Sequence, residues 1–576
     1  MQYCNLLQNL SAMKNPVYCC LFFYFFPLWL TAQQAFMDSI WLETPNLRVC
    51  LRTNGSLYAG SKAGAVQFRH QSLFGEKWTT VVKESGLWFG GIDPAGNLLL
   101  SAQQFEPNRI TDFRAGLPGL PGSDKFWLIS HDQIVQHLED YSQDAVIDHP
   151  IPEIFAWPGP GNRFFKAYNG FELPIDFHGN WGNFLDRNNN NIYEPDKGEY
   201  PVFKQTFGGK AVYFPDQIVA FLFHTDGLSL EFPATSGYPA SGMGYAYTLN
   251  CPAKALFANS IYFTWVWQNA GARPLDSNYV ACYINADIGN PNDDYHGSNW
   301  NTYWVYNADS VYDARFEMAA PVLSVRSIQG PLDMYGGANM PLIMPVGTQT
   351  DLPPVRFPES PLEYYRYLTC HWRDGTPLTN GGNGYGGSEV ARQVFRGNPY
   401  APGVWSEVNA QTTRGDRRAL FSWYYHRWFL PGATNSLSYY LTVHPKPETT
   451  QANYEWFESI INDLSTSDWV DGFGFSGSFE PGCNTWPVST FDHMAIRTYP
   501  NPVSDMLYIQ YEGDLPTRIR LYDWNHRVAA EIIDMNLGWG NPVQIPVRHL
   551  PPGVYFLEAG SRNSIQTNVQ KVVVLH

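Results

Sequence analysis

The chain has 576 residues, more than one hydrophobic core usually supports, so its length predicts two or three domains. It is 44% hydrophobic, 16% aromatic and only 16% charged, with 49 Gly and 43 Pro, which is typical of short strands joined by many loops and not of helical bundles. The formal net charge of −16 argues against nucleic acid as the main partner, because phosphate binding needs a surplus of Lys and Arg; it would suit calcium.

Residues 1–32 have the layout of a signal peptide. Lys14 supplies a positive charge, residues 17–30 form an almost unbroken apolar run, and Ala32 is a small residue at the expected cleavage point. Because the residues before Met13 carry no charge, Met13 is a candidate for the true start. The apolar run is short for a transmembrane helix and no other stretch is long enough, so we expect export through the periplasm and no transmembrane segment in the mature chain.

Five cysteines follow the expected cleavage point. An odd number allows at most two disulfides, and the lack of a CxxC pair argues against a zinc knuckle or a redox motif. We therefore expect one or two structural bridges, with the pairing left open, among Cys50, Cys251, Cys282, Cys370 and Cys483.

Strand patterns dominate the region of residues 33–470, which we expect to form one or two sandwich-like domains with a few short helices. The turn sequence at 93–97 predicts a hairpin, and helical spacing after Ser130 predicts a capped helix. The predicted strands are 87–92, 98–100, 217–223, 255–267 and 279–284, and the predicted helices are 131–141 and 451–464.

The segment from residue 186 onward resembles the front half of a calcium-binding loop. Oxygen-bearing side chains stand at positions 1, 3 and 5, where a tight loop turns alternate side chains onto one hard cation, and position 7 would add its carbonyl oxygen. Position 12 is Lys197 and not Glu, so two nearby acids would have to replace that carboxylate. The alternative is an Asn-rich turn held by its own hydrogen bonds. The candidate calcium ligands are Asp186, Asn188, Asn190, Ile192, Asp196 and Glu199.

A second acidic cluster comprises Asp287, Asp293 and Asp294, followed by His296. It could hold a cation, but acidic residues also favour turns, and we prefer the second interpretation.

No catalytic motif is present. The sequence lacks HExxH, a GxSxG elbow, a Walker loop and a dinucleotide fingerprint, which argues modestly against an enzyme. A pair of carboxylates for glycoside hydrolysis is set in space and not in sequence, so a hydrolase of polysaccharide or protein stays the alternative.

Residues 471–496 have the Gly, Ser and Pro content of a linker, and alternating short strands follow. Six or seven strands in about 80 residues are typical of a small Ig-like β-sandwich. The predicted strands are 506–511, 518–523, 527–533, 543–547, 554–559 and 571–575.

Residues 497–576 resemble a type A C-terminal sorting domain of the type IX secretion system. The resemblance rests on four segments in the family's order: 499–509, 521–528 (with His526 where Gly is usual), 550–557 and 571–574. It implies recognition by the type IX machinery and passage across the outer membrane. It also implies removal of the domain by a sortase-like peptidase, attachment to surface lipopolysaccharide, and a secreted or cell-surface location.

The middle region is similar to a recurrent cargo type of Bacteroidota, through the segments 86–93, 191–195, 198–201 and 374–379. This resemblance implies a large β-rich extracellular body and supplies no activity. The sequence thus predicts an all-β secreted protein whose middle region is a binding or structural module, with Ca²⁺ as its one expected ion.

Overall fold

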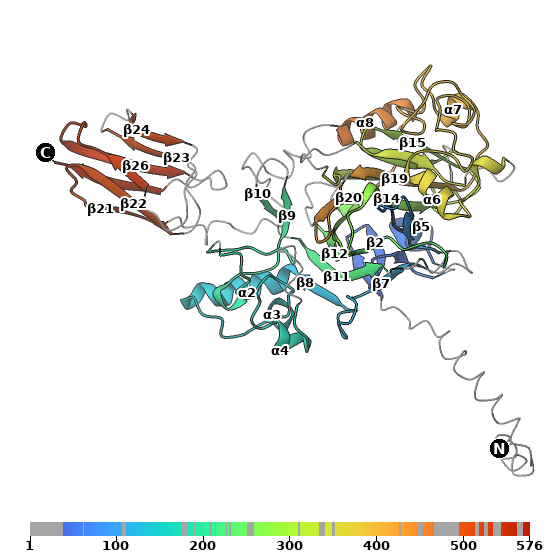
Figure 1. Ribbon diagram of the computed structural model, residues 1–576. Helices are drawn as coiled ribbons and strands as arrows, with labels where there is room; N and C mark the ends of the chain where they lie inside the picture. Colours follow the sequence, from blue (N-terminus) through green and yellow to red (C-terminus); the bar gives the residue numbers. More distant parts are fainter. Residues whose placement is uncertain are drawn as a thin grey trace, which may run out of the picture. The chain divides into compact units, whose positions relative to one another are not determined.

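The structure is a computed structural model of the chain (Figure 1). The expected signal peptide, most of the expected linker, Cys251 and Cys483 lie outside the described residues. The described residues are 39–60, 63–105, 111–173, 182–188, 190–206, 210–213, 215–225, 227, 229, 232–249, 258–308, 312–332, 340–347, 352–425, 428–446, 453–465, 495–512, 518–523, 528–533, 543–560 and 568–575.

Two antiparallel sheets of nine strands each form the body, as far as the chain is described. The first sheet has the order β1 (Ser39–Glu43), β2 (Leu47–Arg52), β3 (Leu57–Tyr58), β5 (Gly75–Ile92), β14 (Asp276–Ala286), β19 (Arg417–Tyr425) and β18 (Leu342–Pro345), with β4 (Val66–Ser72) beside β2 and β5, and β6 (Leu98–Ala102) beside β5. The second has the order β15 (Asp294–Asn299), β16 (Thr302–Asn307), β17 (Val322–Gln329), β20 (Thr434–His444), β13 (Ser260–Asn269), β12 (Ala240–Thr248), β11 (Gln217–Thr225) and β7 (Phe113–Ala115), with β8 (Phe126–Ser130) beside β11. A separate pair joins β9 (Phe203–Thr206) and β10 (Lys210–Tyr213).

The two sheets pack face to face around one hydrophobic core. Alternate residues of β13 point into it, so that Trp265 and Trp267 share it with Phe89 of the first sheet. The rings of Phe89 and Trp267 lie 5.4 Å apart. Each such side chain, when fully buried, contributes about 1.5–3 kcal/mol of hydrophobic free energy.

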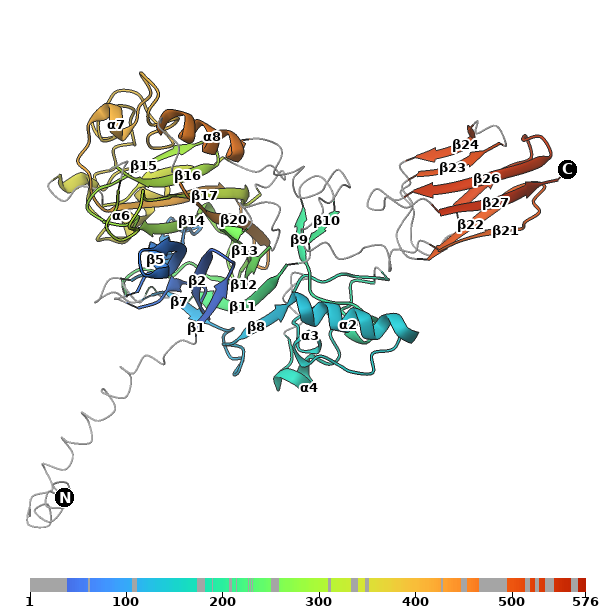
Figure 2. The same cartoon turned by 180° about the vertical axis from the view of Figure 1, so that it is seen from behind.

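The outer face of the second sheet is also covered. Tyr262, on the other side of β13, packs with a helical segment that holds α2 (His131–Asp144), α3 (Pro152–Phe155) and α4 (Phe165–Asn169). Farther along the same face, α8 (Asn453–Ser465) covers β16 and β17 (Figure 2). Burial on both faces explains why strands such as β11 are almost wholly apolar.

The remaining helical elements of the body are short. They are α6 (Pro361–Leu368), α7 (Glu407–Ala410) and the 3₁₀ turns η2 (Pro195–Lys197) and η3 (Pro353–Val355). The α6 helix lies against the first sheet, where the rings of Tyr364 and Trp88 are 4.6 Å apart.

The structure confirms the all-β class and the main predicted elements of the body. β5 and β6 form the expected hairpin, with Ile92 opposite Leu98. The α2 helix begins after Ser130 with a reciprocal capping box to Gln133, and α8 occupies the second predicted helical region.

The preference for disulfide bridges is not supported by the cysteines that the structure describes. Cys50, Cys282 and Cys370 are buried thiols, and Cys282 lies 3.6 Å from the Ser85 hydroxyl. These three side chains fill apolar space in strands and beside α6, as small hydrophobic residues do. The sequence could not show this, because an oxidising compartment permits bridges without requiring them.

The C-terminal segment is a second, smaller sandwich. One sheet has the order β21 (Ala495–Tyr499), β22 (Met506–Glu512) and β25 (Val543–Pro546); the other has the order β24 (Val528–Ile533), β23 (Arg518–Tyr522), β26 (Gly553–Gly560) and β27 (Asn568–Val574). Buried residues of both sheets, such as Leu507 and Leu557, share a core of their own. β21 begins at Ala495, two residues before the predicted start of this domain.

Candidate functional site

The segment of residues 182–202 forms the predicted candidate loop beside the helical part of the body. Leu185 N–H donates to Tyr200 O at 2.9 Å and Val202 N–H to Asn183 O at 3.2 Å, which brings the two ends of the loop together. Tyr193 is fully buried and its hydroxyl donates to Ile154 O at 2.9 Å. The loop is therefore anchored from both ends and from its middle.

Asp186, the first candidate ligand, holds the turn that follows it. Its Oδ1 accepts the Asn190 N–H at 3.2 Å and its Oδ2 accepts the Asn191 N–H at 2.8 Å. Asn191 has φ +57°, a left-handed conformation that Asn tolerates better than most residues. The carboxylate of position 1 thus faces the backbone of positions 5 and 6.

Glu194 joins the candidate ligands, although the sequence analysis did not select it. Asn188 and Asn190 each donate a side-chain N–H to its Oε2 at 2.8 Å, and Lys197 Nζ lies 2.5 Å from its Oε1. The hydrogen bond from Lys197 is the main reason that the pKa of Glu194 falls to about 2. Glu194 occupies the ninth position counted from Asp186, which is itself a ligand position in calcium loops, so the spacing alone could have identified it.

The two acids expected to replace the position-12 carboxylate have different surroundings. Asp196 lies 2.5 Å from Arg163 in an ion pair. Glu199 is fully buried and accepts the N–H groups of Arg187 and Glu194 at 3.0 and 2.7 Å. Burial raises the pKa of Glu199 to about 7.

Ile192, at position 7, exposes 44% of its surface, and its N–H donates to Asn190 Oδ1 at 2.7 Å. The structure therefore brings Asp186, Asn188, Asn190 and Glu194 together in one loop and directs Asp196 elsewhere. Across the described residues, no three His, Cys, Asp or Glu side chains are grouped closely enough to hold a metal ion by themselves.

The second acidic cluster is divided among separate partners. Arg315 donates to Asp287 at 3.1 Å, Asn307 donates to Asp293 at 2.8 Å, and buried Asp294 accepts the Ile288 N–H at 3.1 Å. Burial raises the pKa of Asp294 well above its usual value. These contacts tie down the loop between β14 and β15.

A buried ion pair holds α7 against the body. Arg417 of β19 donates to both oxygens of Glu407 from Nε at 3.1 Å and to one from Nη2 at 2.8 Å, and both side chains are almost fully buried. Glu407 also accepts the backbone N–H of His296 at 2.5 Å. Removing one partner of such a pair leaves a buried charge, so loss of either residue alone would destabilise the fold.

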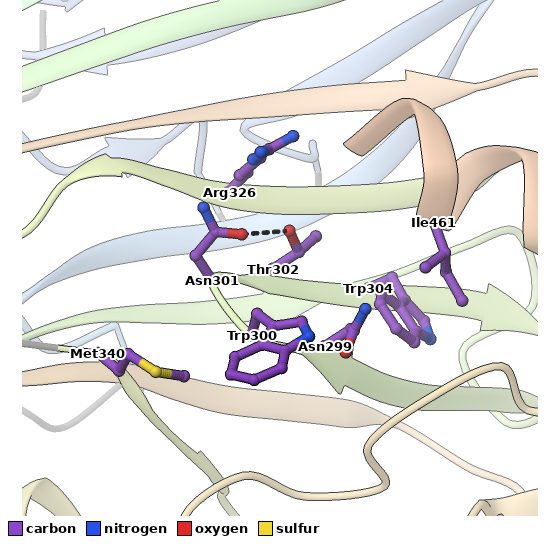
Figure 3. Close-up of a pocket in the computed structure, with 8 residues that line it drawn as sticks. All are labelled: Asn299, Trp300, Asn301, Thr302, Trp304, Arg326, Met340 and Ile461. Atoms are coloured by element: carbon purple, nitrogen blue, oxygen red, sulfur yellow. Dashed lines mark hydrogen bonds between the residues drawn. The ribbon is translucent and has the colours of Figure 1, made fainter. Parts of the chain in front are cut away.

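A pocket of about 400 Å³ lies at the β15–β16 hairpin, beside α8 (Figure 3). Trp300 and Asn301 form the two-residue turn of this hairpin, between the paired residues Asn299 and Thr302. The residues that line it are Asn299, Trp300, Asn301, Thr302, Trp304, Arg326, Met340 and Ile461.

The turn that presents Trp300 is held at several points. Its carbonyl accepts a hydrogen bond from the Gln393 amide, and the Asn301 carbonyl accepts the Ser327 N–H at 2.9 Å. The Arg396 guanidinium lies 4.0 Å from the centre of the indole, and the Trp300 side chain stays half-exposed. Sequence reasoning missed this site because nothing in the local sequence distinguishes Trp300 from the other tryptophans of the chain, which has 20.

Comparison with family models identifies the C-terminal segment. Residues 497–575 match the family described as a secretion system C-terminal sorting domain. This agrees with the predicted resemblance, its boundaries and the two-sheet fold of the segment. The segment is therefore a type IX secretion sorting domain, and the chain is directed to the cell surface or released outside the cell.

The comparisons give no such identification for the body. A search of curated proteins found no match. One similar solved structure is a polysaccharide lyase, with 10% sequence identity and a TM-score of 0.17 over 65% of this chain and 38% of the lyase. The chain thus spans well under half of that protein's length. A similarity this low indicates neither a shared fold nor a shared activity.

Within the described part of the chain, the helices are too short or too polar to cross a membrane.

Proposed function

We propose that residues 33–470 act outside the cell as a binding or structural module, delivered there by the sorting domain. The observation that best supports this is the pocket beside Trp300. Amide, hydroxyl, guanidinium and apolar groups line it, which are groups that orient and hold a ligand. Five of the eight lining residues stand on the β15–β16 hairpin, whose turn is fixed by hydrogen bonds, so this part of the site is formed before a ligand arrives.

The test compares binding with turnover. Purified full-length protein is mixed with insoluble polysaccharides and with cells that lack the gene, and the bound fraction and any soluble products are measured. We expect retention without products, and weaker adhesion by the deletion strain. Release of sugars or peptides that grows with time would favour the alternative, a hydrolase.

We also propose that the loop from Asp186 to Glu199 binds Ca²⁺ as a structural ion. Asp186, Asn188, Asn190 and Glu194 occupy positions 1, 3, 5 and 9 and carry carboxylate and amide groups, whose oxygens are ligands that calcium prefers. In the structure the Asn188 and Asn190 amides donate N–H to Glu194, so each would turn its oxygen toward the ion on binding. Each carboxylate oxygen has more than one acceptor site, so the N–H bonds to Asp186 do not exhaust its capacity. The donor set therefore fits the ion, and with neutral Asn at two positions it suits weak binding.

The calcium proposal predicts a rise in melting temperature that depends on Asp186. At about ten times its Kd the ion should stabilise the fold by about 1.4 kcal/mol. The Asp186→Ala variant should lose this response, measured by thermal unfolding with calcium and with a chelator. Asp93→Ala is a matched control, because Asp93 also caps a turn by accepting N–H groups, at 2.8 and 2.9 Å, and should leave the calcium response intact. An unchanged calcium response in the Asp186→Ala variant would show that this loop does not bind calcium.

We propose further that residues 1–32 are removed as a signal peptide and that a sortase-like peptidase removes the sorting domain, leaving the body attached to surface lipopolysaccharide. The matched sorting domain supports this, because the secretion machinery recognises such domains. Intact-mass measurement of the exported protein reports both ends of the chain. A mass that includes the C-terminal sandwich would contradict removal.

A further inference from the structure

The strongest additional feature of the molecule is the conformation of Trp300. Its φ is +49°, in the left-handed region that a bulky side chain rarely adopts. Two-residue hairpin turns ordinarily place Gly, Asn or Asp at such a position. A tryptophan there costs free energy, and residues held in strained conformations cluster at ligand-binding sites.

The surroundings of Trp300 give the indole a fixed orientation. Arg396 lies against the ring with its guanidinium carbon 4.0 Å from the ring centre, and 54% of the residue's surface stays accessible. The carbonyls of both turn residues accept hydrogen bonds, which fix the backbone from which the ring projects. An exposed, oriented aromatic face is a platform on which the apolar face of a sugar ring can stack.

The polar part of the pocket supplies both donors and acceptors, and its one charged group, the Arg326 guanidinium, supplies donors only. The Trp304 indole N–H and Arg326 Nη1 are buried and have no hydrogen-bond partner among the described residues. The side chains of Asn299 and Asn301 line the same space (Figure 3). The Arg326 guanidinium has donors only, so a ligand that meets it in the pocket has to bring acceptor oxygens.

The charge of the pocket has the opposite sign from that of the chain. The eight lining residues include Arg326 and no carboxylate, and Arg396 lies against Trp300, whereas the whole chain has a formal net charge of −16. Neither guanidinium forms an ion pair with a described residue. A guanidinium binds carboxylate more strongly than it binds a neutral hydroxyl.

We propose that this pocket binds a uronic acid residue of an acidic polysaccharide, with the sugar ring stacked on Trp300 and its carboxylate toward Arg326. The proposal rests on the proposed function, since it names the ligand class of that binding module. The volume of about 400 Å³ is in the range of small-ligand sites.

Titration calorimetry of the full-length chain tests the proposal, with short oligomers of galacturonate, mannuronate and glucuronate as probes. At least one should bind, and its neutral methyl ester should bind about tenfold more weakly or not at all. Trp300→Gly removes the ring and accepts the positive φ, so the fold is kept while affinity falls about tenfold or more. Arg326→Gln should abolish the preference for the acid over the ester.

Trp41→Ala is the matched control, because Trp41 is a second exposed tryptophan stacked by an arginine, with Arg48 4.8 Å from its ring centre, and it does not line the pocket. Its affinity should equal that of the wild type. The proposal is overturned if none of the three oligomers binds, if Trp300→Gly binds like the wild type, or if acid and ester bind equally. If no oligomer binds but the chain still adheres to cells without turnover, the uronic acid proposal is contradicted while the proposed binding function stands.

Discussion

His444 ends β20 at a partly enclosed position that disfavours its charged form. Its Nε2 lies 2.8 Å from the Ser324 hydroxyl oxygen, and burial lowers its pKa from the usual 6.5 to about 4. The unfolded chain therefore binds a proton at a higher pH than the folded chain does. The neutral imidazole contributes full stability above about pH 6.5, and this contribution is lost as the pH falls toward 4.

We expect the His444→Gln variant to lack this part of the pH dependence, because Gln cannot take up the proton and can still reach Ser324. Between about pH 7 and pH 4 the wild type should lose on the order of 2 kcal/mol more unfolding free energy than the variant. Urea unfolding of both proteins across this range measures the difference. Other buried histidines, such as His137, are present in both proteins and cancel. Parallel pH profiles would contradict the assignment.

At the scale of single residues, the sequence predicted the loop but not all of its contacts. The oxygen spacing identified Asp186, Asn188 and Asn190, because local spacing fixes which side chains share a tight turn. It did not show that Asp196 pairs with Arg163, which is distant in sequence. The position of Trp300 was hidden for the same reason, since its partners Gln393 and Arg396 come from another loop.

At the scale of elements, β12 shows how close packing is encoded by small residues. Gly244 faces the ring of Phe221, and a Cβ at this position would lie 2.1 Å from the nearest ring atom. Neither the ring nor the strand can move far inside a packed sandwich. The strand was not predicted, because its first half, Ala-Ser-Gly-Met-Gly, lacks the β-branched and aromatic residues that mark strands.

We expect the Gly244→Ala variant to be destabilised by about 1–3 kcal/mol through overpacking. Chemical denaturation of the full-length protein measures this. Gly227→Ala is the matched control, because a Cβ there has open space around it, and it should change stability by no more than about 0.5 kcal/mol. Equal stability of Gly244→Ala and the wild type would show that the strand can shift to make room.

The elements that the sequence did predict carry strong local signals. The hairpin of β5 and β6 has its Asp-Pro-Ala-Gly-Asn turn, where Asp93 accepts two backbone N–H groups, and α2 has a reciprocal cap at Ser130. Strand order has no such signal. The neighbours of β20 are β17 and β13, and nothing local in residues 434–444 specifies them.

At the scale of the whole molecule, the sorting domain determines where the body works. Deleting residues 497–576 should abolish export, so that the body accumulates inside the cell envelope and is absent from the medium and the surface. Fractionation with an antibody against the body measures this. Trp300→Gly in the intact chain is the control and should be exported normally, since its sorting domain is unchanged. Export of the truncated chain would contradict the route.

The position of β20 has a consequence for how the body folds. Ser260 of β13 pairs with Thr442 of β20, 182 residues later, and β20 separates β13 from β17 in the second sheet. Because the chain is synthesised from its N-terminus onward, this sheet cannot close until nearly the whole body has been made. Such non-local pairing makes folding slow. Until then the apolar strands stay exposed, and so the interval between synthesis and closure is when this protein is most open to aggregation and proteolysis.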